Sequence, residues 1–191
     1  MSAPTIRVAD PERDATAIAA IYRPIVLETA TSFEVDPPSS EEMSNRVRST
    51  LETYPWIVAE QAGEVVAYAY GSRLRARSAY RFSVEVSVYL AERARGRGLG
   101  RRIYDALLRV LEDLGYANAY AGIALPNEAS VRLHESMGFR SIGVFERVGF
   151  KRGAWHDVSW WQLELQPGTL EAPESFSDLS DSRLGSLLGG H

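Results

Sequence analysis

The sequence predicts a single mixed α/β domain, because stretches with the two-residue period of strands alternate with stretches at helical spacing. The clearest strand covers residues 80–90, where Val84, Val86 and Val88 alternate with Glu85. The chain has 191 residues, of which 45% are apolar. It is therefore long enough for one domain with its own core and too short for two ordinary ones.

The N-terminal part predicts a short strand and two helices. The strand covers residues 5–8. Asp10 and Pro11 predict the start of the first helix, because Asp caps helices and Pro is favoured at the first helical position. Ser39 and Glu42 have the spacing of a capping box, which predicts the start of the second helix.

The rest of the chain predicts a hairpin over residues 56–70, the strand at 80–90, and an amphipathic helix that ends at Gly115. Next come a strand at 116–124, a helix at 127–137 and two strands near 139–148 and 156–165. The expected order is β-α-α-β-β-β-α-β-α-β-β, and we expect the domain to span residues 1–166. Residues 167–191 are rich in Gly, Ser, Asp and Glu, which indicates a flexible C-terminal tail. The alternative is a short docking helix there, built on Leu184, Leu187 and Leu188.

Composition argues against several classes of protein. The net charge is −4, which gives no overall attraction to nucleic acid or to an anionic membrane. There is no cysteine, so disulfides, thiolate metal ligands and a cysteine nucleophile are excluded. His134, His156 and His191 lack ligand spacing, and we expect no metal site. No signal peptide or membrane-spanning run is visible, so we expect a cytoplasmic protein.

The most informative segment is Arg-Gly-Arg-Gly-Leu-Gly-Arg-Arg at residues 95–102, between a predicted strand and a predicted helix. Gly96, Gly98 and Gly100 would let backbone N–H groups approach a ligand closely, and a helix start favours an anion. The arginines of this segment concentrate positive charge in an otherwise acidic chain. The pattern indicates a pyrophosphate cradle. The alternative is a glycine-rich turn with a solvated basic face.

Arg95-x-x-Gly98-x-Gly100 resembles the R/Q-x-x-G-x-G/A signature with which the GNAT superfamily of N-acetyltransferases binds the pyrophosphate of acetyl-CoA. The element order resembles that fold from about residue 5 to residue 165. More narrowly, the chain resembles the phosphinothricin and methionine sulfoximine N-acetyltransferases. The matching segments are Tyr54–Trp56, Arg75–Tyr80, Val84–Glu85, Val88–Tyr89, Leu125–Asn127, Ser130–Glu135 and Gly153–Val158.

This resemblance implies a mixed, mostly antiparallel twisted sheet that is split around the acetyl-CoA site and flanked by helices. It implies an enzyme that uses acetyl-CoA as co-substrate, without a metal, and a homodimer with acceptor pockets near the interface. The implied cofactor-binding residues are Val88, Tyr89, Leu90, Arg95, Gly96, Arg97, Gly98, Leu99, Gly100, Arg101, Asn127 and Ser136. The implied acceptor-binding residues are Arg75, Arg77, Glu85, Val86 and Ser87. Val86 departs from the group, which more often has a small polar residue there.

An amine acceptor must lose a proton before it can attack a thioester, because amines are mostly protonated at neutral pH. Glu85 is the candidate general base, since it lies in the middle of a predicted strand, and burial would raise its pKa. The alternative is a structural carboxylate paired with a neighbouring arginine. His134 stands where many GNAT enzymes have a tyrosine that protonates the leaving thiolate. It is a candidate acid or proton relay, or alternatively a packed helix histidine. Because there is no cysteine, we expect direct transfer in a ternary complex.

Arg75 and Arg77 alternate along an extended stretch, so we expect them to point the same way and to bind a carboxylate or phosphinate. Phe33 is a candidate wall of the acceptor pocket, or alternatively a core residue.

Three functions compete. The first is acetylation of phosphinothricin, methionine sulfoximine or methionine sulfone. The second is acetylation of another amine, such as a polyamine or a protein N-terminus, although two arginines argue against a polycation. The third is a CoA-binding module without turnover, against which the presence of both Glu85 and His134 argues.

Overall fold

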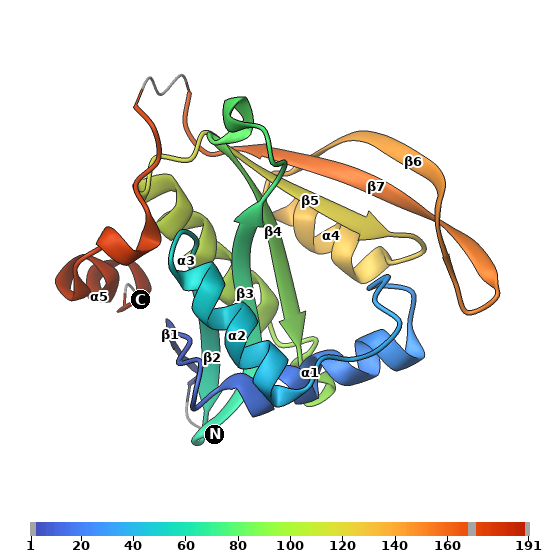
Figure 1. Ribbon diagram of the computed structural model, residues 1–191, viewed down its shortest axis with the longest axis horizontal. Helices are drawn as coiled ribbons and strands as arrows, with labels where there is room; N and C mark the ends of the chain where they lie inside the picture. Colours follow the sequence, from blue (N-terminus) through green and yellow to red (C-terminus); the bar gives the residue numbers. More distant parts are fainter. Residues whose placement is uncertain (1–2, 168–170, 190–191) are drawn as a thin grey trace.

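The computed structural model describes residues 3–167 and 171–189 and contains a seven-stranded sheet (Figure 1). The strand order is β1-β2-β3-β4-β5-β7-β6. Every neighbouring pair is antiparallel except β4 and β5, which are parallel. The strands are β1 (Thr5–Val8), β2 (Trp56–Gln61), β3 (Glu64–Arg73), β4 (Ser83–Leu90), β5 (Asn118–Ala124), β6 (Arg140–Lys151) and β7 (Ala154–Glu164).

Helices cover both faces of the sheet, and the β6–β7 hairpin extends beyond them (Figure 1). Packing of α1 and α2 against β2 and β3 forms one core, and packing of α3 against β2 to β5 forms the other. The helices are α1 (Ala15–Glu28), α2 (Ser40–Leu51), α3 (Leu99–Asp113), α4 (Glu128–Ser136) and α5 (Asp181–Gly189), and single 3₁₀ turns lie at Ser78–Tyr80, Glu92–Ala94 and Phe176–Asp178. In the described ranges, no helix is both long and apolar enough to cross a bilayer.

The alternation predicted for β4 places its side chains on two different faces. Val84 and Val86 are buried in the core that α3 covers. Glu85 lies opposite Ser72 of β3 and therefore points to the other face, toward α1 and α2. The mixed α/β fold predicted from the sequence is thus confirmed, and strand parity fixes the side on which Glu85 lies.

The first helix begins later than the sequence predicts. The Asp10 carboxylate accepts hydrogen bonds from the backbone N–H groups of Glu12 and Arg13, at 2.9 and 3.0 Å, and so closes a turn. The helix itself starts at Ala15. The second start is as expected, because Ser39 and Glu42 form both hydrogen bonds of the capping box.

Residues 171–189 of the predicted flexible tail are docked, while residues 168–170, 190 and 191 of it lie outside the described residues. Residues 171–189 pack on the domain: Phe176 and Leu179 are 5% and 8% exposed, within the core under α3. The backbone N–H of Phe176 donates to the carbonyl of Thr53 at 3.1 Å, and Arg183 pairs with Asp113 at 2.7 Å. Apolar side chains of α5, namely Leu184, Leu187 and Leu188, pack against the same core. Composition predicted a tail because Gly, Ser, Asp and Glu outnumber the apolar residues in this segment.

Candidate active site

β4 and β5 diverge and leave a gap in the middle of the sheet. They pair only where Ser83 to Glu85 meet Asn118 to Tyr120. On the β5 side, the Phe82 carbonyl accepts a hydrogen bond from Ala117 N at 2.9 Å. On the opposite side, Ala91 N donates to the Val66 carbonyl of β3. Because peptide groups alternate along a strand, the N–H groups of Val86, Val88 and Leu90 face the gap. Beyond Glu85 no described strand pairs with this edge.

A narrow cavity of about 60 Å³ lies in this gap. Its lining from β4 includes the predicted residues Val86, Ser87, Val88 and Tyr89, whereas Leu90 lies outside it. The other lining residues are Thr31, Ala121, Gly122, Ile123, Ala124, Asn127, Ser130 and His134. The cavity therefore joins the edge of β4, the start of α4 and the loop after α1.

The glycine and arginine segment forms the turn from β4 into α3. Gly96 and Gly98 have φ of +72° and +76°, and a Cβ atom at either position would meet nothing within 4 Å. These left-handed conformations require glycine, and the space in front of the turn is open. Gly98 is the N-cap of α3 and provides no side-chain cap, so Leu99 and Gly100 begin a helix whose first N–H groups have no capping side chain.

Arginines surround this turn. Arg101 donates to the carbonyl of Ser136 at 2.9 Å and so connects the start of α3 to the end of α4. Arg95 donates to the carbonyl of Leu90 at 3.3 Å, and Arg97 is exposed. Ser136 is exposed beside Arg101, whereas Asn127 lies at the other end of α4 and caps it by accepting from Ser130 N at 3.2 Å. The turn is thus a basic, open helix start beside the gap.

Glu85 is half-buried, on the side of the sheet that α1 and α2 cover. Burial raises the pKa of its carboxyl group, and the positive charge of Arg75 partly offsets that rise. The guanidinium of Arg75 lies 5.5 Å from the centre of the Trp160 ring. No ion pair of Glu85 is found among the described residues. A half-buried carboxylate without an ion-pair partner is a candidate general base.

His134 is buried, and both of its ring nitrogens have partners. Nδ1 lies 2.8 Å from the carbonyl oxygen of Ser130, which can only accept, so Nδ1 carries a proton. In the neutral imidazole, Nε2 accepts from the Tyr104 hydroxyl at 3.0 Å. Burial lowers the pKa of His134, while the hydrogen bond to Ser130 opposes that shift. The side chain is therefore a neutral imidazole at the edge of the cavity, backed by a buried phenol.

Arg75 and Arg77 line a second cavity, of about 490 Å³, where β3 ends and β4 begins. Arg73 and Arg81 line it too, and the C-terminal segment forms one wall through Pro173 and its neighbours. In the described part of the chain, none of these four arginines forms an ion pair with a carboxylate. This cavity is strongly cationic and separate from the narrow one.

A scan against family models matches the acetyltransferase (GNAT) domain over residues 6–160. The chain belongs to the GNAT acetyltransferase family. This family domain covers all seven strands at least in part, and α5 lies beyond its end.

Several of the similar proteins are named as N-acetyltransferases of phosphinothricin or of methionine sulfoximine and methionine sulfone. The phosphinothricin N-acetyltransferase of Streptomyces viridochromogenes is 39% identical over 141 residues, which are 73% of this chain and 77% of that protein. The L-methionine sulfoximine/L-methionine sulfone acetyltransferase of Salmonella typhimurium is 36% identical, over 84% of this chain and 94% of that one. A phosphinothricin acetyltransferase of Sinorhizobium meliloti, solved with AcCoA, superposes with a TM-score of 0.84 at 37% identity, over 91% and 94% of the two chains.

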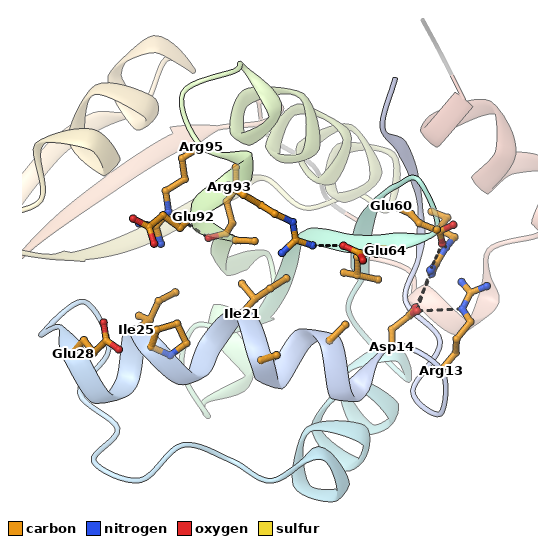
Figure 2. Close-up of a pocket in the computed structure, with 18 of the residues that line it drawn as sticks. Arg13, Asp14, Ile21, Ile25, Glu28, Glu60, Glu64, Glu92, Arg93 and Arg95 are labelled. Carbon is orange, nitrogen blue, oxygen red and sulfur yellow. Dashed lines mark hydrogen bonds and ion pairs between the residues drawn. The ribbon is translucent and has the colours of Figure 1, made fainter. Parts of the chain in front are cut away.

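A further cavity of this GNAT domain, of about 660 Å³, lies between α1 and the start of the glycine turn (Figure 2). Figure 2 shows α1 along one side and Arg93 and Arg95 on the opposite side. Its charges are largely paired with one another: Arg93 with Glu64 at 2.7 Å, and Asp14 with Arg7 and Arg13. The cavity is apart from Glu85 and His134, which do not line it.

Several residues around the gap were not predicted from the sequence. Tyr104 was not singled out within the predicted amphipathic helix, Thr31 received no role, and Ser130 was part of a matching segment but also received no role. Trp160, which contacts Arg75, is one of several aromatic residues in a strand. The Tyr104–His134 and Arg75–Trp160 contacts join elements distant in sequence, so spacing along the chain contains no signal for them. In the described ranges there is no group of three side chains that could hold a metal ion.

Proposed function

We propose that this chain transfers the acetyl group of acetyl-CoA to the amine of a small amino-acid-like acceptor of the phosphinothricin, methionine sulfoximine or methionine sulfone type. The single observation that supports this most strongly is the gap between β4 and β5, which opens beside a half-buried Glu85 of raised pKa. The names of the similar proteins support the acceptor class.

The residues of this chain fit acetyl-CoA. The unpaired peptide groups of Val86 and Val88 can bond an amide-containing arm as a neighbouring strand would. The open glycine turn and the uncapped start of α3 fit a pyrophosphate, with Arg95, Arg97 and Arg101 beside it. When bound, acetyl-CoA supplies an electrophilic acetyl thioester.

The proposed roles of the side chains follow from where each one lies. Glu85 accepts a proton from the acceptor ammonium, directly or through a water, and so frees the attacking amine. A backbone N–H of β4 that faces the gap stabilises developing negative charge on the reacting carbonyl oxygen. His134, held by Ser130 and Tyr104, relays a proton: its neutral imidazole takes up the proton that the attacking nitrogen still has to lose and passes it to the leaving sulfur.

Arg75 and Arg77 would bind the acid group of the acceptor. Both are exposed, and Arg75 acts electrostatically on Glu85. A carboxylate held by Arg75 would place the α-amino group of the same molecule near Glu85, because the two groups share one carbon atom. A polyamine would instead meet four arginines that form no ion pair with a described carboxylate.

The test is acetyl-CoA-dependent release of free thiol with phosphinothricin, methionine sulfoximine, methionine sulfone, a polyamine and an N-terminal peptide. Glu85→Gln should lose ~10²-fold or more in kcat, the usual size of general-base catalysis. It should still bind acetyl-CoA, and Glu164→Gln, an exposed control, should be unaffected. Turnover only on the polyamine or peptide would overturn the acceptor class. Acetyl-CoA binding without turnover would favour a CoA-binding module.

The acceptor contact has its own test. Arg75→Gln should raise KM for phosphinothricin much more than KM for acetyl-CoA. Arg23→Gln, which changes an exposed arginine of α1, should alter neither KM. An unchanged KM for phosphinothricin in Arg75→Gln would contradict the assignment.

We also propose that two copies associate through the β6–β7 hairpin. Its exposed apolar side chains, each 43–62% accessible, are Ile142, Val144, Phe145, Val148, Phe150 and Trp155. Soluble monomers rarely leave so many together, and β6 is an edge strand of the sheet. Light scattering should give twice the mass of one chain, and Phe145→Lys should reduce the measured mass to that of one chain.

A cytoplasmic location stays a prediction that cell fractionation can check.

A further inference from the structure

The loop after α1 reaches the gap through residues 29–34. Thr31 lines the narrow cavity beside Val88. On the side of α1 and α2, hydrogen bonds fix this loop. The Tyr22 hydroxyl of α1 lies 2.6 Å from Ser32 Oγ, and Arg46 of α2 donates two hydrogen bonds to Glu34, at 2.8 and 2.9 Å. The loop therefore has a defined position relative to the sheet, and Thr31 is the part of it that borders the cavity.

The other side of the 29–34 loop is held by Lys151, at the end of β6. Its ammonium group donates to the carbonyl of Val26 at 2.7 Å and to the carbonyl of Ser32 at 2.6 Å. The side chain is 8% exposed, and no described carboxylate pairs with it. Val26 lies in the last turn of α1, where carbonyl dipoles favour a cation. One ammonium thus joins the end of α1, the loop and the hairpin.

Lys151 is also the single lysine of the sequence, which otherwise uses 20 arginines as its basic residues. The difference matters physically. A compact ammonium has three donors that rotate freely and can serve two converging carbonyls at short distance, whereas a guanidinium is a wide planar fork. Neighbouring Arg152 donates to the Leu27 carbonyl, at 2.7 Å, and is exposed. The lysine is therefore matched to a site that arginine does not fit.

Gly149 provides the second contact between the hairpin and the loop. A Cβ atom at this position would lie 2.2 Å from Phe33 Cε2 and 2.3 Å from Phe33 Cζ. The Phe33 ring therefore packs directly on the backbone of β6. Gly149 lies opposite His156 of β7, whose ring centre is 6.3 Å from that of Phe33 and whose Nε2 lies 3.1 Å from the Lys151 carbonyl. Any side chain at 149 would displace the ring.

We infer that Lys151 and Gly149 are positioning residues of the acceptor site: they hold the 29–34 loop, and with it Thr31 and Phe33, at the distance from β4 that an amino-acid-sized acceptor needs. The inference rests on the proposed function. Neither residue lines the narrow cavity, so both act through the loop. The glycine turn and the start of α3, which fit the pyrophosphate of acetyl-CoA, are not part of the narrow cavity that Thr31 lines, so we expect acetyl-CoA binding to change much less than acceptor binding.

The first test replaces the ammonium. In Lys151→Met, backbone amides of residues 29–34 should exchange with deuterium about tenfold faster or more, while those of α3 keep their protection. KM for the acceptor should rise ~10-fold or more, because a small displacement of a positioning group has a large effect. KM for acetyl-CoA should stay within about twofold. Arg152→Met is the matched control and should change none of these. Unchanged loop exchange and unchanged acceptor KM in Lys151→Met would overturn the inference.

The second test uses a double-mutant cycle at Gly149 and Phe33. Gly149→Ala should raise the acceptor KM in the native background but add less than about twofold in a Phe33→Ala background, where no ring is left to displace. An equal effect in both backgrounds would overturn the inference. If the native chain acetylates no acceptor, the proposed function fails by itself, and the exchange measurement still tests whether Lys151 holds the loop.

Discussion

Phe176→Ala measures how firmly the C-terminal segment is docked. The side chain is 5% exposed and lies in the core covered by α3, together with Leu179. Removing a buried phenyl ring costs about 3–5 kcal/mol in a well-packed core. We expect the lower end, about 3 kcal/mol, because the segment is near a chain end and can relax. For a domain of this size that corresponds to a fall in Tm of roughly 6–12 °C.

The assay is thermal unfolding of the full chain, followed by circular dichroism. Val35→Ala is the control, since it removes an apolar side chain that is 72% exposed and should leave Tm within about 2 °C. A chain that ends at residue 170 should lose at least as much stability as Phe176→Ala. Equal Tm values for the native chain, the variant and the shortened chain would refute the docking of residues 171–189.

Three further predictions concern charge, backbone and pH. Asp14→Ala should cost about 3 kcal/mol of folding free energy in urea unfolding, because its buried carboxylate accepts hydrogen bonds from Arg7 at 2.6 and 2.9 Å. Glu12→Ala, which removes an exposed carboxylate, is the control and should not change the urea midpoint. Gly98→Ala should cost about 1–2 kcal/mol of folding free energy in backbone strain, because φ is +76° at this position. It should also weaken acetyl-CoA binding, as measured by calorimetry. Gly185→Ala in α5, where a Cβ atom would meet open space, should do neither. Because burial lowers the pKa of His134, the unfolded chain takes up its proton first, so this residue's contribution to stability is lost as pH falls below about 6.5. The native chain should therefore lose more Tm between pH 7 and pH 5 than His134→Gln does, and parallel losses would contradict the shift.

Local patterns in the sequence predicted the elements whose formation depends on neighbouring residues. The capping box at Ser39 and Glu42 and the alternation in β4 are of this kind, and both are present. The start of α1 was misplaced because Asp10 stabilises a turn and a helix start with the same type of hydrogen bond. The C-terminal helix was left as an alternative, because its docking depends on a core built by residues far upstream.

The candidate site shows the same division. Strand alternation singled out Glu85, and the glycine spacing indicated the turn before α3, whereas the gap in the sheet was expected only from the family resemblance. Lys151, more than a hundred residues from the carbonyls it bonds, could not be found from spacing. A basic residue in a hairpin has the same appearance in sequence whether it faces water or a helix end.

Because Lys151 is the sole lysine, a protease that cleaves after lysine has one target peptide bond in the whole chain. The side chain that such an enzyme must bind is held between Val26 and Ser32 in the folded protein. Cleavage therefore requires the hairpin to separate from α1, and each cut yields two fragments, the first of which ends at Lys151. The rate of that single cut reports how often the acceptor side of the molecule opens, without any label or mutation.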